Sequence, residues 1–262
     1  MVKRVLSALI GAPLLLGITW LGGTYLAVTI LILALLALRE FLVIGQQAGI
    51  ASNTGLTFFF CALWLFIFVI GYTQWLLPLG VIWFIIVFAG YALAYPDRSY
   101  TEASYNFLAL IYPVLLFTYL FYLRELPNGF LWAIYVFVTV WLTDTGAFLT
   151  GNALGKRKLA PRVSPNKSVE GALGGLIVAI VSGFFFWMWT DLGSLLVILM
   201  LSLLTSIVSQ MGDLFESAIK RSAGVKDSGN LIPGHGGVLD RFDSFLFAIP
   251  VVYFALMIGL VG

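Results

Sequence analysis

Residues 54–72 read TGLTFFFCALWLFIFVIGY and contain no charged side chain. An apolar stretch of about 20 residues is long enough to cross the hydrocarbon core of a membrane as one α-helix. The pattern recurs on both sides of this stretch, and the breaks between runs give nine predicted spans. These spans are residues 4–21, 24–44, 54–72, 75–95, 104–123, 129–151, 169–190, 194–218 and 243–261. The sequence therefore predicts an all-α, polytopic transmembrane protein.

The composition of the whole chain agrees with this fold class. Of its 262 residues, 61% are hydrophobic and only 10% are charged, whereas a soluble domain carries about 25% charged residues. No polar block is long enough to fold separately, so we expect one integral membrane domain over residues 1–262. Within it, residues 1–128 are expected to form lipid-facing scaffold spans and residues 129–262 the catalytic spans and loops. The single cysteine, Cys61, excludes an intramolecular disulfide.

The distribution of basic residues predicts the orientation. If the N-terminus is cytoplasmic, thirteen of the 14 Lys and Arg residues lie on the cytoplasmic side and only Arg124 lies opposite. This is the positive-inside pattern. Trp and Tyr residues near predicted span ends, such as Trp75 and Trp132, are typical of interfacial belts rather than of a platform for bases. We therefore expect membrane lipid as a partner and no nucleic acid.

Polar residues gather in three segments after residue 143. The first begins with TDTGAF at residues 143–148 and continues through a basic stretch to RVSPNKSVEG at 162–171. A carboxylate such as Asp144 inside an apolar helix is costly unless it is paired or binds a cation. Glycines and hydroxyls let backbone amides approach an anion, and Ser168 to Glu170 are expected to cap the seventh span. An ordinary positive-inside loop accounts for the lysines alone.

The second segment overlaps the end of the eighth predicted span, and the third leads into the ninth. Residues 209–221 read SQMGDLFESAIKR, in which Asp213, Glu216 and Lys220 share one helical face. Residues 226–244 read KDSGNLIPGHGGVLDRFDS and contain the only histidine, His235. Carboxylates with few nitrogen or sulfur ligands favour Mg²⁺. The residues thus indicate Mg-dependent phosphate transfer in a membrane. An internal ion-pair stripe and a tight glycine turn are the structural alternatives.

Residues 217–243 resemble the signature of phosphatidate cytidylyltransferases, also called CDP-diacylglycerol synthases. Residues 144–171 and 209–221 resemble further patterns of that family, so the similarity covers about the last 120 residues. The resemblance implies that CTP and phosphatidate react to give CDP-diacylglycerol and pyrophosphate in phospholipid biosynthesis. It also implies a Mg²⁺ cofactor, a second cation such as K⁺, and a homodimer. The expected location is a bacterial-type inner (plasma) membrane, multi-pass, with the active site facing the cytoplasm.

The resemblance also assigns roles to individual residues. Expected metal ligands are Asp213, Asp240, Asp144 and Asp243. The residues expected to act in catalysis are Asp213, Asp240, Lys220, His235 and Arg241. Those expected to bind substrate are Lys167, Ser168, Ser209, Ser217, Arg221, Lys226, Gly236 and Gly237.

Two other functions compete with this interpretation. A CTP-dependent lipid-alcohol kinase would share the spans and acidic residues, but it would not be expected to match residues 217–243. An ion transporter would distribute polar residues through the membrane depth, whereas here they cluster toward predicted cytoplasmic ends of spans.

Overall fold

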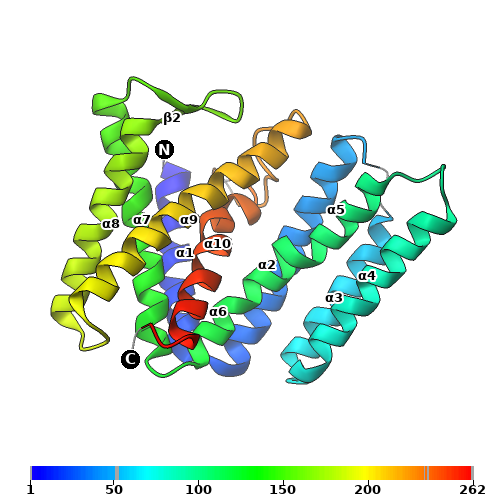
Figure 1. The fold of residues 1–262 in the computed structure, drawn as a ribbon, viewed down its shortest axis with the longest axis horizontal. Helices are drawn as coiled ribbons and strands as arrows, with labels where there is room; N and C mark the ends of the chain where they lie inside the picture. Colours follow the sequence, from blue (N-terminus) through cyan, green and yellow to red (C-terminus); the bar gives the residue numbers. More distant parts are fainter. Residues whose placement is uncertain (1, 51–52, 233, 235, 261–262) are drawn as a thin grey trace. The chain divides into compact units, whose positions relative to one another are not determined.

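The structure is a computed structural model that describes residues 2–50, 53–232, 234 and 236–260. The chain divides into two compact units, the first made of Met1–Phe121 and Ile219–Arg241 and the second of Tyr122–Ala218 and Phe242–Gly262. Segment 219–241 therefore belongs with the N-terminal helices. Figure 1 shows the order of the elements.

The first unit begins with a run of long helices. These are α1 (Val2–Leu21), α2 (Gly23–Gln47), α3 (Thr54–Val69), a 3-10 turn η1 (Thr73–Trp75), α4 (Leu76–Leu93) and α5 (Tyr100–Leu110). After α5, the π-helical segment η2 (Ile111–Leu115) contains Pro113 and continues into α6 (Leu116–Glu125), which from Tyr122 onward belongs to the second unit. The break between α1 and α2 falls at Gly22, whose φ of 64° favours glycine. The Gly22-Gly23 pair is thus a helix break rather than a kink.

Helix α2 supplies much of the buried surface of the first unit. Phe41 is fully buried, its ring stacks on Tyr105 of α5 with centroids 4.4 Å apart, and the Tyr105 hydroxyl donates to the Phe41 carbonyl at 2.5 Å. Trp83 of α4 stacks on Phe60 of α3 at 4.5 Å. Aromatic stacking, with a hydrogen bond from a ring hydroxyl, thus joins α2 to α5 and α3 to α4.

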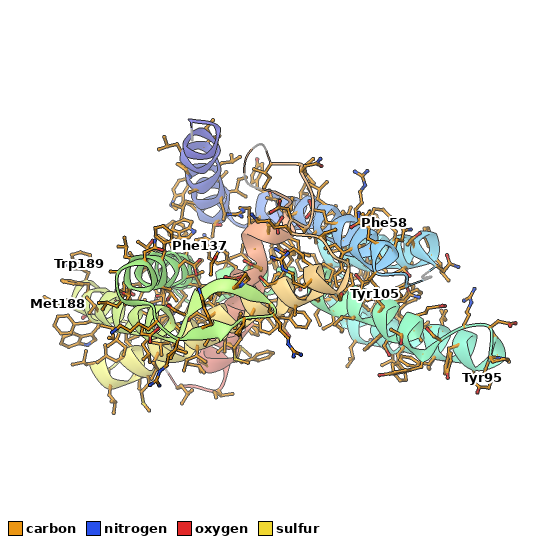
Figure 2. The ribbon with its side chains drawn as sticks, turned by 90° about the horizontal axis from the view of Figure 1, so that it is seen from above. Phe58, Tyr95, Tyr105, Phe137, Met188 and Trp189 are labelled. Atoms are coloured by element: carbon orange, nitrogen blue, oxygen red, sulfur yellow. The ribbon has the colours of Figure 1, made fainter. Side chains whose placement is uncertain are left out.

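The second unit contains α7 (Gly129–Leu154), a hairpin of β1 (Lys158–Ala160) and β2 (Ser164–Ser168), and α8 (Val169–Trp189). Helix α9 (Leu195–Ser222) and helix α10 (Leu239–Met257) follow, each shared with the first unit. The strands pair antiparallel, with Lys158 opposite Ser168. Phe137 lies in the core of this unit, whereas Met188 and Trp189 project from the end of α8 (Figure 2) and are 55% and 81% exposed.

Helices α7 and α8 run side by side and pack through glycines. A Cβ added at Gly171 would lie 2.8 Å from the Ala147 carbonyl oxygen, and one at Gly175 would lie 2.9 Å from the Thr143 carbonyl oxygen. Close approach through small residues four apart is a recurring mode of helix packing in membranes.

The predicted all-α architecture is confirmed apart from the short hairpin. Within the described residues a helix lies in each of the nine predicted ranges, and six helical segments are long and apolar enough to cross a membrane. The end of α9 and the beginning of α10 differ from the predicted span boundaries. Helix α9 extends to Ser222, which keeps Lys220 on the predicted helical face, and α10 begins at Leu239, four residues before the predicted span.

Candidate active site

The second unit contains a polar cavity of about 600 Å³. Helix α7 contributes Asp144, β2 contributes Asn166 and Lys167, and α9 contributes Gln210 and Asp213. The hairpin that follows α7 carries basic and polar side chains to this cavity, where the sequence had predicted a loop. With Lys158 of β1, two carboxylates and two lysines from four elements thus line one space.

An ion pair crosses this cavity. The Lys167 ammonium lies 2.5 Å from Asp213 Oδ2, and the two side chains are 29% and 30% exposed. Ser217, one turn further along α9, donates its hydroxyl to Asp213 Oδ1 at 3.3 Å. Because both ions remain accessible to water, the pair can open for an incoming phosphate at small cost in stability. The lysine is then available to the phosphate and the aspartate to a cation.

The start of α8 is anchored as predicted. Ser168 is its N-cap residue, and the Ser168 hydroxyl accepts from the Gly171 N–H at 3.1 Å. Glu170 accepts from the backbone N–H groups of Lys156 and Arg157 at 3.0 and 3.1 Å. The cap satisfies a free helix N–H group, and the glutamate fixes the first residues of the basic segment against the helix.

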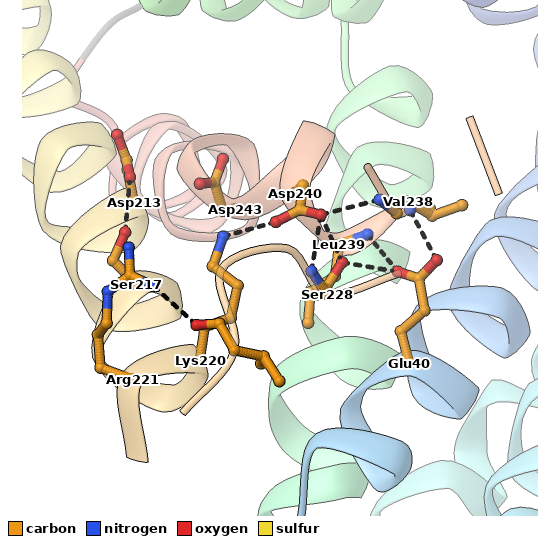
Figure 3. A network of polar contacts seen from close by, with 12 residues as sticks. Glu40, Asp213, Ser217, Lys220, Arg221, Ser228, Val238, Leu239, Asp240 and Asp243 are labelled. Atoms are coloured by element: carbon orange, nitrogen blue, oxygen red, sulfur yellow. Dashed lines mark hydrogen bonds and ion pairs between the residues drawn. The ribbon is translucent and has the colours of Figure 1, made fainter. Parts of the chain in front are cut away.

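The first unit contains a second, more buried cluster around Asp240 (Figure 3). The Lys220 ammonium lies 2.5 Å from Asp240 Oδ1, and their side chains are 10% and 4% exposed. Asp240 Oδ2 accepts from the Gly237 N–H, the Ser228 N–H and the Ser228 hydroxyl at 2.8 to 2.9 Å. Three donors therefore surround Oδ2, whereas Oδ1 faces the lysine.

These contacts also set the protonation of Asp240, which lies ahead of the predicted span 243–261. Burial opposes the charged form and would raise the pKa of Asp240. Hydrogen bonds from Lys220 and from the Gly237 and Ser228 N–H groups, together with the lysine charge, outweigh burial and hold the pKa below its ordinary value. The carboxylate is thus ionised at neutral pH.

The glycines beside this cluster have a local geometric role. Gly236 has a φ of 83°, and a Cβ there would clash with the Asp240 carboxylate. A Cβ at Gly237 would clash with the Ser228 hydroxyl and the Glu40 carboxylate. Glycine at these two positions therefore lets the backbone pack directly against the Asp240 and Glu40 carboxylates.

The remaining predicted residues are placed as follows. Arg221 donates to the Val225 carbonyl at 2.7 Å, Ser209 is buried and donates to the Ser206 carbonyl at 2.9 Å, and Asp243 accepts from the Ser244 N–H at 2.7 Å. Lys226 and Arg241 are exposed. His235 lies outside the described residues.

Glu40 of α2 lies beside this cluster and was not among the predicted site residues. Its carboxylate accepts from the Val238 N–H, the Leu239 N–H and the Ser228 hydroxyl (Figure 3). The signal that could have found it was a carboxylate inside a predicted span whose only other charged residue is Arg39, because such a group requires a partner.

The donor set can be compared with the needs of Mg²⁺. Within the described part of the chain, no group of three or more His, Cys, Asp or Glu side chains is placed to hold a metal ion. Asp144 and Asp213 nevertheless line the same cavity. Mg²⁺ commonly binds one or two carboxylates and takes its other ligands from water and substrate phosphates, so this cavity fits such an ion.

Comparison with known proteins identifies the family. The profile of the cytidylyltransferase family matches residues 2–258. A phosphatidate cytidylyltransferase of Staphylococcus haemolyticus is 36% identical over 261 residues, which cover 97% of this chain and 98% of the relative. One from Bacillus subtilis is 46% identical over 160 residues, 60% of each chain, and one from Staphylococcus aureus is 35% identical over 265 residues, 97% of this chain and 98% of the relative. The chain belongs to the cytidylyltransferase family.

Proposed function

We propose that this protein is a phosphatidate cytidylyltransferase, which converts CTP and phosphatidate to CDP-diacylglycerol and pyrophosphate in phospholipid biosynthesis. The observation that carries the proposal is the similarity over 97% of the chain to a relative of that name. The cavity lined by Asp144, Lys167 and Asp213 supports it, because cations and carboxylates suit phosphate chemistry.

The chemistry asks the protein mainly for charge neutralisation and alignment. An oxygen of the phosphatidate phosphate forms a bond to the α-phosphorus of CTP. The bond from that phosphorus to the β-phosphate bridging oxygen breaks, and pyrophosphate leaves with the electron pair. A phosphate monoester is already anionic near pH 7, so no general base is required. Lys167 and Lys220 would reduce the repulsion between the two anions, and Arg221, Lys226 and Arg241 would add positive charge.

A Mg²⁺ ion is part of this proposal, with a second cation such as K⁺. Asp213 and Asp144 would hold the ion in the cavity of the second unit, and Asp240 and Asp243 stay predicted ligands. When bound, Mg²⁺ neutralises phosphate charge and makes the α-phosphorus a better electrophile. Ser168, Ser209, Ser217, His235, Gly236 and Gly237 are the remaining proposed contacts to substrate.

The proposed setting is a bacterial-type plasma membrane. We assign nine spans, a cytoplasmic N-terminus, a single membrane domain with a scaffold half before residue 129, and a homodimer. The segregation of basic residues supports this orientation. Soluble CTP and the leaflet-bound lipid would then meet at the cytoplasmic surface, where basic loops attract anionic headgroups.

Two labelled forms of CTP test the reaction. Purified protein is incubated with phosphatidate micelles, Mg²⁺ and CTP labelled at either the α- or the γ-phosphorus. Cytidylyl transfer puts only the α-label into the organic phase, and omission of phosphatidate abolishes it. If the γ-label enters a lipid alcohol instead, or if no label enters lipid with several cations and phosphatidate species, the proposal fails.

A further inference from the structure

The carboxylate of Glu40 is buried where the 228–239 segment meets helix α2. Glu40 is 9% exposed. Its Oε1 accepts from the Val238 N–H at 2.9 Å, while Oε2 accepts from the Leu239 N–H at 2.8 Å and the Ser228 hydroxyl at 3.1 Å. Both oxygens therefore have donors, and all three donors come from the segment that leads into Asp240.

Two of these donors lie at the beginning of α10. The first N–H groups of a helix have no partner within that helix, and they form its positive end. The carboxylate of Glu40 therefore caps α10 from another helix. Asp240 accepts the N–H of Gly237, which lies two residues before the first residue of α10. The two carboxylates together fix the first turn of α10.

The same contacts connect Glu40 to the Lys220–Asp240 ion pair. Ser228 Oγ lies 3.1 Å from Glu40 Oε2 and 2.9 Å from Asp240 Oδ2, so its single hydroxyl proton is shared between the two carboxylates. A Cβ at Gly229 would lie 2.9 Å from Glu40 Oε1. The backbone therefore closes tightly on Glu40, and a displacement of this carboxylate would move the groups that hold Asp240.

Helix α2 is itself held in place beside Glu40. The next residue, Phe41, is fully buried, stacks on Tyr105 and accepts the Tyr105 hydroxyl through its carbonyl. Gly45, one turn further, faces the same ring so closely that a Cβ would clash with it. Glu40 thus stands on a rigid part of the unit, as a group that positions others must.

We propose that Glu40 is a positioning residue of the transfer reaction, acting through the α10 cap and Ser228 to orient Asp240 and Lys220 toward the phosphates. This role rests on the proposed function. It gives helix α2, in the predicted scaffold half, a direct part in the site. Glu40 itself touches neither substrate in this scheme.

The test compares Glu40→Gln, Glu40→Asp and the control Glu125→Gln, which alters an exposed glutamate at the end of α6. An amide has one acceptor oxygen, so the side chain introduced by Glu40→Gln must turn its NH₂ group toward at least one N–H donor. We expect kcat for α-label transfer to fall about 10- to 100-fold in Glu40→Gln, with a smaller change in KM for CTP. Glu40→Asp should recover part of the loss, and Glu125→Gln should match wild type.

Hydrogen exchange supplies a readout that does not depend on activity. The amides of Val238 and Leu239 should exchange faster in Glu40→Gln than in Glu125→Gln, because they lose their acceptor. An unchanged kcat in Glu40→Gln, or a lower Tm with unchanged kcat per folded molecule, overturns the positioning role alone. Wild-type protein that makes no α-labelled lipid overturns the proposed function and this role together.

Discussion

The aspartates Asp213 and Asp240 differ in their exposure to water. We therefore expect substitution of Asp240 to lower the stability of the protein, and substitution of Asp213 to lower activity with little effect on stability. Asp240 is 4% exposed and paired with a lysine that is 10% exposed. Removal of one partner from a buried pair leaves an uncompensated charge, which costs about 3–5 kcal/mol. The partly exposed pair of Asp213 and Lys167 contributes about 1 kcal/mol or less.

For the buried pair, we predict that Asp240→Asn and Lys220→Met each lower the free energy of unfolding by about 3–5 kcal/mol. The double variant should be more stable than either single variant, because no unpaired charge is left inside. Denaturant unfolding of the purified protein in detergent measures this. Losses that simply add in the double variant would show that the two side chains are not coupled.

For the exposed pair, we predict that Asp213→Asn changes the free energy of unfolding by less than about 1 kcal/mol and abolishes CDP-diacylglycerol formation. The cause is loss of a proposed cation ligand without loss of packing. Asp191→Asn, at an exposed position between α8 and α9, is the matched control and should remain active. Substantial activity in Asp213→Asn would remove this residue from the proposed ligand set.

For individual residues, the sequence indicated which side chains could act in phosphate chemistry, but not which side chains contact each other. The family resemblance assigned site roles to Asp240 and Lys220, but nothing in their spacing indicated that they pair with each other. Glu40 received no role, because its donors are 188 to 199 residues away in sequence. A carboxylate in a largely apolar span indicates only that Glu40 needs a partner, and the identity of that partner depends on tertiary structure.

Among the elements, α7 and α8 pack against each other closely at glycines. The glycines of this region were interpreted as aids to anion approach, and Gly151 and Gly171 do line the polar cavity. Gly171 also lies against the Ala147 carbonyl, and Gly175 against that of Thr143. Helix contact thus explains part of a pattern that the sequence had assigned to phosphate binding.

Matched glycine substitutions test this packing. Gly175→Ala should destabilise the protein by about 1–3 kcal/mol, because its Cβ would meet a backbone carbonyl at 2.9 Å. Gly80→Ala in α4 has open space around the new Cβ and should stabilise by up to about 1 kcal/mol through helix propensity. Thermal unfolding should therefore shift in opposite directions, and equal shifts would exclude close packing at Gly175.

Helix positions were more predictable than the segments between them. Apolar runs of membrane length fix where helices occur, and α8 begins at the Ser168 cap that its sequence predicts. The hairpin of β1 and β2 was not predicted, because a short basic stretch containing Pro165 has no strand periodicity. The π-helical segment at Pro113 was also invisible, since its form depends on packing of the surrounding helix.

The whole molecule is organised by its charge pattern and by two discontinuous units. Thirteen of 14 basic residues fall on one predicted side of the membrane. The order of apolar spans along the chain is enough to predict on which side of the membrane each basic residue lies. It could not predict that residues 219–241 join the N-terminal unit, and the division of roles at residue 128 stays a prediction.

Cysteine labelling tests the orientation of the molecule. The native Cys61 is buried in α3 and should not react. In intact cells, a membrane-impermeant maleimide should label Glu125→Cys, on the predicted outer side, and leave Arg162→Cys unlabelled. Both positions are exposed, so Arg162→Cys should react once the membrane is opened. Labelling of Arg162→Cys in sealed cells would contradict the proposed topology, because it would place residue 162 on the outer side.

The distance in sequence between Glu40 and its donors has a consequence for biosynthesis. Helix α2 leaves the ribosome at least 188 residues before the first of these donors. At about 5–20 residues per second, Glu40 waits about 10–40 s for them. During that time the carboxylate in α2 lacks these three native donors. A nascent chain that stops before α10 therefore keeps a carboxylate in α2 without its two backbone donors, whereas the finished chain buries it.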